Sequence, residues 1–335
     1  MANIWYIQVN RHCNNGCHFC SNPSNGKNIT YERGKEIIDD FVARQYKGII
    51  FTGGEPTLSP DLARWIAYTH SVGIESRIIS NGMMCASFPY MKKLADAWLE
   101  LVHFSVYSYN PTIHDFLTDT PGSWKKLMLS IRNALHLWVR VQINTVISHY
   151  SQWHLDITAK FLVRQFPKIQ HFVWNNLDPH MMRKTDTALS TLPDFFLFEA
   201  PLRRAMQFLE DSGRTFRVER VPLCYMRWFE YASTETRKIV KNEERVIHFL
   251  DDRKVVEQKS EWFHHDMWEK CRSCDLRDIC AGIWMHEPSV AFGESHPGYF
   301  RDVLYKPQTV SQEEKRYIIQ KIQKYEEKKS AISEL

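Results

Sequence analysis

The stretch IWYIQVNRHCNNGCHFC, residues 4–20, joins an apolar run to a loop that contains three closely spaced cysteines. Residues 4–9 are apolar and of strand length, so they predict a buried β-strand. Cys13, Cys17 and Cys20 follow directly, and the next cysteine in the chain is Cys85. The fold therefore depends on the sheet that this strand joins. The function depends on what the three thiols at its end bind.

Apolar runs of strand length alternate with segments of helical period through the first half of the chain. Six such β/α units predict a parallel sheet covered by helices, either an open sheet or part of a barrel. The predicted strands are residues 4–9, 48–52, 76–80, 101–107, 139–147 and 169–174, and the predicted helices are 31–46, 60–72, 90–99, 123–137, 155–166 and 200–213.

Length and composition limit the class of protein. A chain of 335 residues with 44% hydrophobic content can bury one large core, or one core and a smaller module. Its net charge of +4 is too small to indicate a nucleic-acid partner. No apolar run reaches the 18 or so residues of a membrane span and no signal segment precedes the first strand, so we expect a cytoplasmic protein. In that reducing compartment, clustered cysteines indicate metal rather than disulfides.

Three motifs follow the first three predicted strands. The cysteine loop follows the first, GGEP at Gly53 to Pro56 follows the second, and SNG at Ser80 to Gly82 follows the third. Because the loops at the carboxyl ends of parallel strands build the site in open sheets and in barrels, we expect the three motifs to converge.

Three thiolates do not complete a four-coordinate metal site. Structural zinc takes four closed ligands, whereas a [4Fe-4S] cluster held by three cysteines keeps one iron open for another ligand. The alternative is a zinc site completed by a histidine such as His12 or His18. The second motif, GGEP, argues against that alternative.

The C-x3-C-x2-C spacing, followed in order by GGEP and SNG, resembles the radical S-adenosylmethionine (SAM) superfamily over roughly the first 180 residues. The resemblance implies a partial (β/α)6 barrel and a [4Fe-4S] cluster on Cys13, Cys17 and Cys20, with SAM on its open iron. It also implies reductive cleavage of SAM to a 5′-deoxyadenosyl radical that abstracts hydrogen from a substrate C–H bond.

The same resemblance implies a set of SAM contacts. Phe19 would lie by the adenine, and the GGEP element would bind the methionine amino group, with paired glycines for close approach and Glu55 facing the ammonium. Polar residues on later strands would approach the ribose or the carboxylate. The implied SAM-contacting residues are Phe19, Gly53, Gly54, Glu55, Pro56, Ser80, Asn81, Ser105 and Asn144. Residues 114–124 also resemble a family stretch, with Thr120-Pro121 in place of its Arg-Gly, and FSVYS departs from the common SLD.

A second cysteine group lies in the other half of the chain. Residues 214–224 predict a strand that ends at Cys224, and residues 245–258 predict a hairpin with Asp251 and Asp252 at its turn. The spacing C-x2-C-x5-C then follows, at Cys271, Cys274 and Cys280. The arrangement resembles the auxiliary-cluster modules called twitch and SPASM, which implies one auxiliary [4Fe-4S] cluster. Structural zinc is the alternative for four thiolates, and Cys224 is either a ligand or a hydrogen donor.

The remaining features complete the predicted organisation. Cys85 is either a buried structural cysteine or a thiol that returns hydrogen to a substrate radical. Ser311 and Glu314 form a capping box before a helix with an apolar stripe at Ile318, Ile322 and Tyr325. We expect three parts: the barrel with its linker helix at 1–213, a small α+β auxiliary-cluster domain at 214–305, and a C-terminal helix at 306–335.

The substrate is expected from the resemblance alone. Twitch and SPASM relatives often oxidise, crosslink or epimerise ribosomal peptides, and others act on small molecules or cofactor precursors. We expect a peptide substrate, an electron donor such as flavodoxin or ferredoxin, and recognition of any leader peptide by the barrel mouth or by a separate protein. Two alternatives from other classes are a zinc-stabilised binding protein and an iron–sulfur electron carrier, both of which GGEP argues against.

Overall fold

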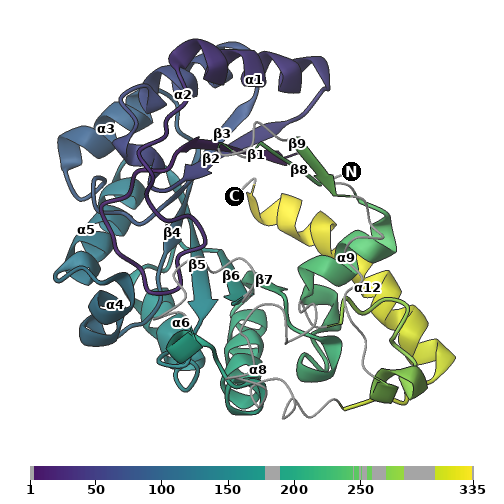
Figure 1. Cartoon of the computed structure of the whole chain (residues 1–335). Coiled ribbons are helices and arrows are strands. Elements are labelled where there is room, and N and C mark those ends of the chain that lie inside the picture. The colour runs from purple at the N-terminus through teal and green to yellow at the C-terminus, as the bar shows by residue number, and fades with distance from the viewer. Residues whose placement is uncertain are drawn as a thin grey trace.

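The computed structural model describes residues 4–177, 189–243, 245–248, 250, 255–258, 269–282 and 306–333. Within these residues the core is one sheet in the order β7-β6-β5-β4-β3-β2-β1-β8-β9, and it curves round as an open barrel (Figure 1). The strands are β1 (Ile4–Asn10), β2 (Gly48–Gly53), β3 (Glu75–Ser80), β4 (Leu101–Ser105), β5 (Arg140–Ile147), β6 (His171–Asn176), β7 (Thr215–Glu219), β8 (Arg245–His248) and β9 (Val255–Gln258).

Strands β1 to β7 are parallel and adjacent in chain order, and helices cover their outer face (Figure 1). The helices are α1 (Tyr31–Ala43), α2 (Leu62–Ser71), α3 (Phe88–Asp96), α4 (Pro111–Thr118), α5 (Ser123–His136), α6 (Leu155–Gln165), α8 (Phe195–Asp211), α9 (Thr234–Lys241) and α12 (Gln312–Ser333). The predicted partial β/α barrel is confirmed. Among the residues that the structure describes, no helix has the length and apolar character needed to cross a bilayer.

The outer face of the sheet is apolar because alternate strand residues meet the helices. Phe51 on β2 and Trp65 on α2 are fully buried and their rings stack at 6.2 Å. Phe104 and Ile143, which pair across β4 and β5, are also fully buried. Their strand neighbours, which point to the opposite face, include the polar Ser105 and Asn144. The interior of the open barrel is therefore polar where the strands end.

The strand predicted over residues 214–224 is shorter than expected and belongs to the barrel. It ends at Glu219 and pairs in parallel with β6 as a seventh strand. Arg220 adopts a left-handed conformation with φ of 60°, which breaks the extended backbone, and Cys224 lies in the short 3-10 helix η3 (Leu223–Tyr225). The sequence prediction missed this turn because no glycine marks it.

The predicted hairpin is present as the antiparallel pair β8 and β9. It joins the other end of the sheet, where Tyr6 and Ile7 of β1 pair in parallel with Ile247 and His248 of β8. The expected turn residues Asp251 and Asp252 lie outside the described residues. Since β7 and the hairpin both extend the barrel sheet, the predicted boundary at residue 213 falls within one continuous sheet, and the domain division stays a prediction.

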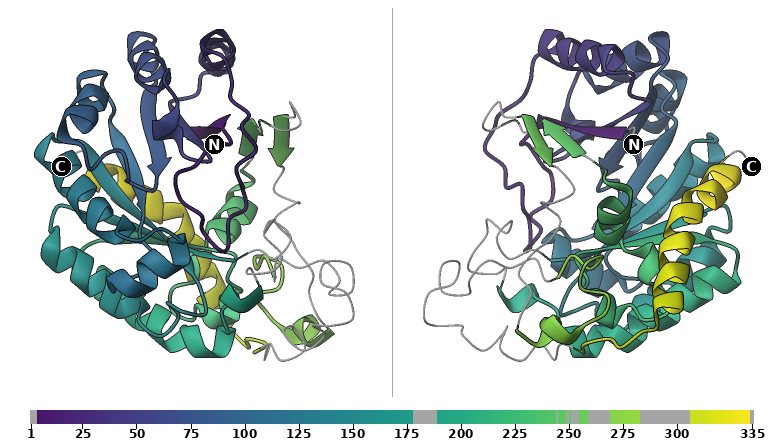
Figure 2. Two further views of the ribbon diagram at one scale, coloured as in Figure 1. Left: turned by 60° about the vertical axis from the view of Figure 1, so that its left-hand side comes forward. Right: turned by 90° about the vertical axis from the view of Figure 1, so that its right-hand side faces the viewer.

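The C-terminal helix α12 packs against α9 and the short 3-10 helix η4 (Glu230–Ala232) beside the β7 end of the sheet (Figure 2). Its predicted cap is present, since Ser311 Oγ accepts the Glu314 backbone N–H at 3.0 Å. The apolar stripe of Ile318, Ile322 and Tyr325 is buried as predicted. The Tyr325 hydroxyl accepts the Phe216 N–H and donates to the Phe216 carbonyl, both at 2.8 Å. This one side chain thus satisfies both backbone groups of a β7 residue on the strand side opposite β6.

Replacing Tyr325 with Phe tests this contact. The variant leaves two buried backbone groups of Phe216 without their partner, so we expect the free energy of unfolding to fall by about 1–3 kcal/mol in urea denaturation. Tyr317→Phe is the matched control because Tyr317 is on the same helix and 61% exposed. Equal effects of the two substitutions would show that the hydroxyl does not secure the strand.

Candidate functional site

The three predicted loops meet at the carboxyl ends of β1, β2 and β3. Gly54 N donates to Asn10 O at 2.8 Å, and Glu55 N donates to His12 O at 2.7 Å. In return, Asn10 Nδ2 donates to Glu55 O at 2.8 Å. The cysteine loop and the GGEP loop are therefore fastened along their backbones, and the predicted convergence is confirmed.

Gly53 and Gly54 are required by this backbone contact. A Cβ on Gly53 would lie 2.2 Å from Asn10 O, and one on Gly54 would lie 2.4 Å from His12 O. Gly53 also has a φ of +140°, which side-chain-bearing residues rarely adopt. We predicted close approach to a ligand at this pair; the structure shows close approach of the cysteine loop, and contact with SAM stays a prediction.

Glu55 joins the GGEP loop to the SNG loop. Its carboxylate is buried, and Oε1 accepts from Thr57 N at 3.1 Å, from Thr57 Oγ1 at 2.6 Å and from Ser80 Oγ at 2.8 Å. Oε2 accepts the Asn81 backbone N–H at 2.7 Å. Burial raises the pKa of Glu55, and these hydrogen bonds oppose that rise. Pro56 begins the 3-10 helix η1 (Pro56–Leu58), which Glu55 caps.

Cys13, Cys17 and Cys20 are half-buried, and the sulfurs of Cys13 and Cys20 receive amide donors. Asn15 N lies 3.4 Å from Cys13 Sγ, and Asn22 N lies 3.3 Å from Cys20 Sγ. Burial raises the pKa of Cys13 to about 11, although the Asn15 hydrogen bond lowers it. Amide N–H donors around sulfur are the surroundings that iron–sulfur ligation uses, so the donor set fits a cluster.

The cysteine loop is fastened on its other side to the end of α4. Gly16 N donates to Thr118 O at 2.9 Å, and His18 N donates to Leu117 O at 3.1 Å. Phe19 is buried against Leu117, and its ring meets that of Tyr107 edge-on at 4.9 Å. The residue predicted to lie by the adenine thus forms one wall of the loop's small apolar cluster.

Residues 114–124, which resemble a family stretch, support this wall. His114 is buried, its Nδ1 accepts the Tyr107 N–H at 3.3 Å, and its ring stacks on Tyr107 at 5.4 Å. Asp115 accepts from Gly122 N at 2.6 Å, from Ser123 Oγ at 2.8 Å and from Trp124 N at 2.7 Å. It therefore caps the start of α5. From the sequence we assigned no role to His114 or Asp115; the His-Asp pair was the available signal.

Ser105 and Asn144 are neighbours in the β4 and β5 register, on the inner face of the sheet. Asn175 on β6 donates its side-chain amide to Asn144 Oδ1. The structure thus places both predicted residues in one polar row beside the loops. Ser80, by contrast, is buried and donates its hydroxyl to Glu55, which is a structural contact.

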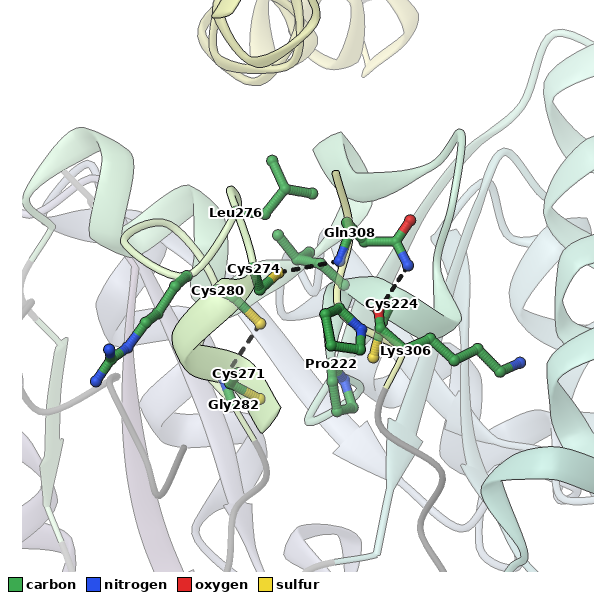
Figure 3. Close-up of a pocket in the computed structure, with 12 residues that line it drawn as sticks. Pro222, Cys224, Cys271, Cys274, Leu276, Cys280, Gly282, Lys306 and Gln308 are labelled. Atoms are coloured by element: carbon green, nitrogen blue, oxygen red, sulfur yellow. Dashed lines mark hydrogen bonds between the residues drawn. The ribbon is translucent and has the colours of Figure 1, made fainter. Parts of the chain in front are cut away.

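The second cysteine group surrounds one pocket. Cys224, Cys271, Cys274 and Cys280 line it together with Lys306 and Gln308 (Figure 3). Gly282 N donates to Cys280 Sγ at 3.3 Å, and Gln308 N donates to Cys274 Sγ at 3.4 Å. Burial raises the pKa of Cys224 to about 12, and the other three thiols add to that rise because they lie near it. The four thiols thus line one pocket, and an auxiliary cluster on them stays a prediction.

No group of three or more His, Cys, Asp or Glu side chains within the described ranges is placed to hold a single metal ion. Cys85 belongs to neither cysteine group. It is fully buried in the hydrophobic core, where burial raises the pKa of its thiol. This placement favours the structural alternative over the hydrogen-donor role for Cys85.

Comparison with known proteins identifies the first half of the chain. Residues 7–162 match the model of the radical SAM superfamily. These residues are similar to a radical SAM domain. The chain is 28% identical to an AdoMet-dependent heme synthase of Oleidesulfovibrio alaskensis over 42% of this chain and 37% of that protein. It is 22% identical to a PqqA peptide cyclase of Bradyrhizobium diazoefficiens over 50% of this chain and 47% of that protein. The chain thus spans less than half the length of both relatives.

The fold extends beyond that domain. The structure of native anSMEcpe with bound AdoMet and Kp18Cys peptide matches with a TM-score of 0.61 and 14% identity over 99% of each chain. At this identity the match establishes the fold. The family match and the named relatives together support an enzyme.

Gly54→Ala should disrupt the contact between the GGEP loop and the cysteine loop. Its Cβ would meet the His12 backbone carbonyl, which cannot move without opening the loop contact, so we expect iron incorporation and thermal stability to fall. Gly16→Ala is a control in the cysteine loop, because its Cβ would meet the Asp119 side chain, at 2.9 Å, rather than backbone. Normal iron content in Gly54→Ala would contradict the assigned contact.

The buried His114 predicts a loss of stability in acid. Burial lowers its pKa to about 4, so the unfolded state binds the proton more readily between pH 6.5 and 4. We therefore expect the free energy of unfolding to fall by ~3 kcal/mol from this group as the pH drops through that range. His114→Asn should flatten this dependence, whereas substitution of the exposed His136 should not. Parallel pH curves for His114→Asn and the unsubstituted protein would contradict this.

Proposed function

We propose that the protein reductively cleaves SAM to a 5′-deoxyadenosyl radical and abstracts hydrogen from a substrate C–H bond. The observation that supports this proposal is that the three loops are joined. The cysteine loop, the GGEP loop and the SNG loop are fastened to one another by backbone bonds and by the Glu55 carboxylate. This arrangement uses residues from three strand ends. A structural zinc site needs only its four ligands, so it does not account for the other two loops.

In this proposal Cys13, Cys17 and Cys20 hold the [4Fe-4S] cluster. The loops and strand ends around them bind SAM, and the cluster with SAM supplies the adenosyl radical when both are bound. The chain's own residues orient the ligand and exclude water from it. The proposed SAM-binding residues are Phe19, Gly53, Gly54, Glu55, Pro56, Ser80, Asn81, Ser105 and Asn144.

We further propose an auxiliary [4Fe-4S] cluster on the second cysteine group, as in twitch modules. Its support is the pocket that Cys224 shares with Cys271, Cys274 and Cys280, and the backbone donors to two of their sulfurs. Cys224 serves as a ligand in this arrangement rather than as a hydrogen donor. The cluster exchanges electrons with the substrate or with the donor protein, which is expected to be a flavodoxin or ferredoxin.

A ribosomally made peptide is the proposed substrate. Support comes from the names of a relative, PqqA peptide cyclase, and of a fold neighbour with a bound peptide. A small molecule or cofactor precursor is the second candidate, because another relative is named a heme synthase. The substrate decides the net reaction. It also decides whether a separate leader-peptide-binding protein is needed.

Iron analysis and an assay for 5′-deoxyadenosine test the proposal. Anaerobically reconstituted protein should hold about eight irons per chain, two clusters of four, and should form 5′-deoxyadenosine from SAM and dithionite. Substituting Cys13, Cys17 and Cys20 with Ala should remove about half the iron and abolish cleavage. The matched triple substitution of Cys271, Cys274 and Cys280 should also remove half the iron, while SAM cleavage continues.

Two outcomes would contradict parts of this proposal. Zinc at the second group, with four irons at the first, would leave SAM cleavage in place and remove the auxiliary redox role. Zinc at both groups with no 5′-deoxyadenosine would overturn the activity itself.

A further inference from the structure

The Asn81 side chain connects the third loop to the sulfur of Cys13. Its Nδ2 lies 3.7 Å from Cys13 Sγ and 2.8 Å from Asn14 Oδ1. Its Oδ1 accepts the Met83 backbone N–H at 2.9 Å. Because a backbone donor takes the oxygen, the NH2 group must face the cysteine loop, and its two hydrogens serve Cys13 and Asn14.

The backbone of Asn81 is held in place independently of its side chain. Its N–H donates to Glu55 Oε2 at 2.7 Å, and the following Gly82 N–H donates to Ser80 Oγ at 3.0 Å. Glu55 is buried and is itself fixed by Thr57. The amide therefore approaches the sulfur from a rigid support, and a side-chain substitution at residue 81 leaves that support intact.

A hydrogen bond to a cluster sulfur stabilises the reduced state, which carries one more negative charge, and so raises the reduction potential. We propose that Asn81 is a positioning residue that raises the reduction potential of the cluster held by Cys13, Cys17 and Cys20. The inference rests on the proposed function and deepens it. It gives Asn81 a second role beside the proposed contact with SAM.

This donor is distinct because it belongs to a side chain. The other described donors to the first group, Asn15 N and Asn22 N, are backbone amides that a substitution does not remove. The donors to the second group, Gly282 N and Gln308 N, are also backbone amides. A change at Asn81 should therefore act on the first cluster and leave the second unchanged.

Asn81→Ala and Asn81→Asp test the proposal in an EPR-monitored redox titration of the reconstituted protein without SAM. The signal of the first cluster is the one that Cys13→Ala, Cys17→Ala and Cys20→Ala together remove. Asn81→Ala loses the donor, so we expect about a ten-fold fall in the equilibrium constant for reduction, which is ~59 mV for one electron. Asn81→Asp also places a carboxylate near the sulfur and should lower the potential further.

Asn14→Ala is the matched control. It removes the other acceptor of the Asn81 amide but leaves the donor to Cys13, so the potential should not move. If Asn81 had only a structural role, its substitution would lower the iron content, and the reduction potential would not fall from the unsubstituted protein to Asn81→Ala and further to Asn81→Asp. Full iron with an unchanged potential in both Asn81 variants, or an equal shift in Asn14→Ala, would overturn the inference.

A measurement on the unsubstituted chain keeps the test independent of folding. Asparagine labelled with 15N at the side-chain amide alone leaves the backbone donors Asn15 N and Asn22 N unlabelled. Pulsed EPR of the reduced first cluster should then show coupling to an amide 15N, and its absence would overturn the inference. If the first group instead binds no iron at all, the proposed function fails; a normal cluster without this coupling refutes the role of Asn81 alone.

Discussion

The buried carboxylate of Glu55 is the interaction on which the arrangement of the site depends. An isolated buried anion is costly, and here the two oxygens accept four hydrogen bonds, from Thr57, Ser80 and Asn81. These donors come from its own loop and from the loop after β3. Because the cost of burial is offset only while the donors stay in place, Glu55 requires the second and third loops to keep one relative position.

The cysteine loop is held between two supports. On one side the Gly53-Gly54 pair lets the GGEP backbone come within hydrogen-bond distance of residues 10 and 12. On the other side the backbone of Gly16 and His18 bonds to the end of α4. Neither support uses a sulfur atom. The thiols are therefore brought together by backbone contacts and remain available as ligands.

The ends of the sheet carry the rest of the chain. At the β7 end, the turn at Arg220 leads to Cys224, and Tyr325 of α12 satisfies both backbone groups of Phe216. At the β1 end, the β8–β9 hairpin extends the sheet. The second cysteine group draws on segments that are far apart in sequence, from residue 224 to residue 308, and that line one pocket.

The partial barrel, the convergence of three loops, the hairpin and the C-terminal stripe of Ile318, Ile322 and Tyr325 could be predicted from the chain, because periodicity and parallel strand order are local signals. Which groups meet depends on how the elements pack. It placed β7 in the barrel, Cys85 in the core, His114 behind Tyr107, and the Asn81 amide on Cys13 Sγ. These contacts join residues far apart in sequence or depend on a single backbone turn, and neither leaves a periodic trace in the chain.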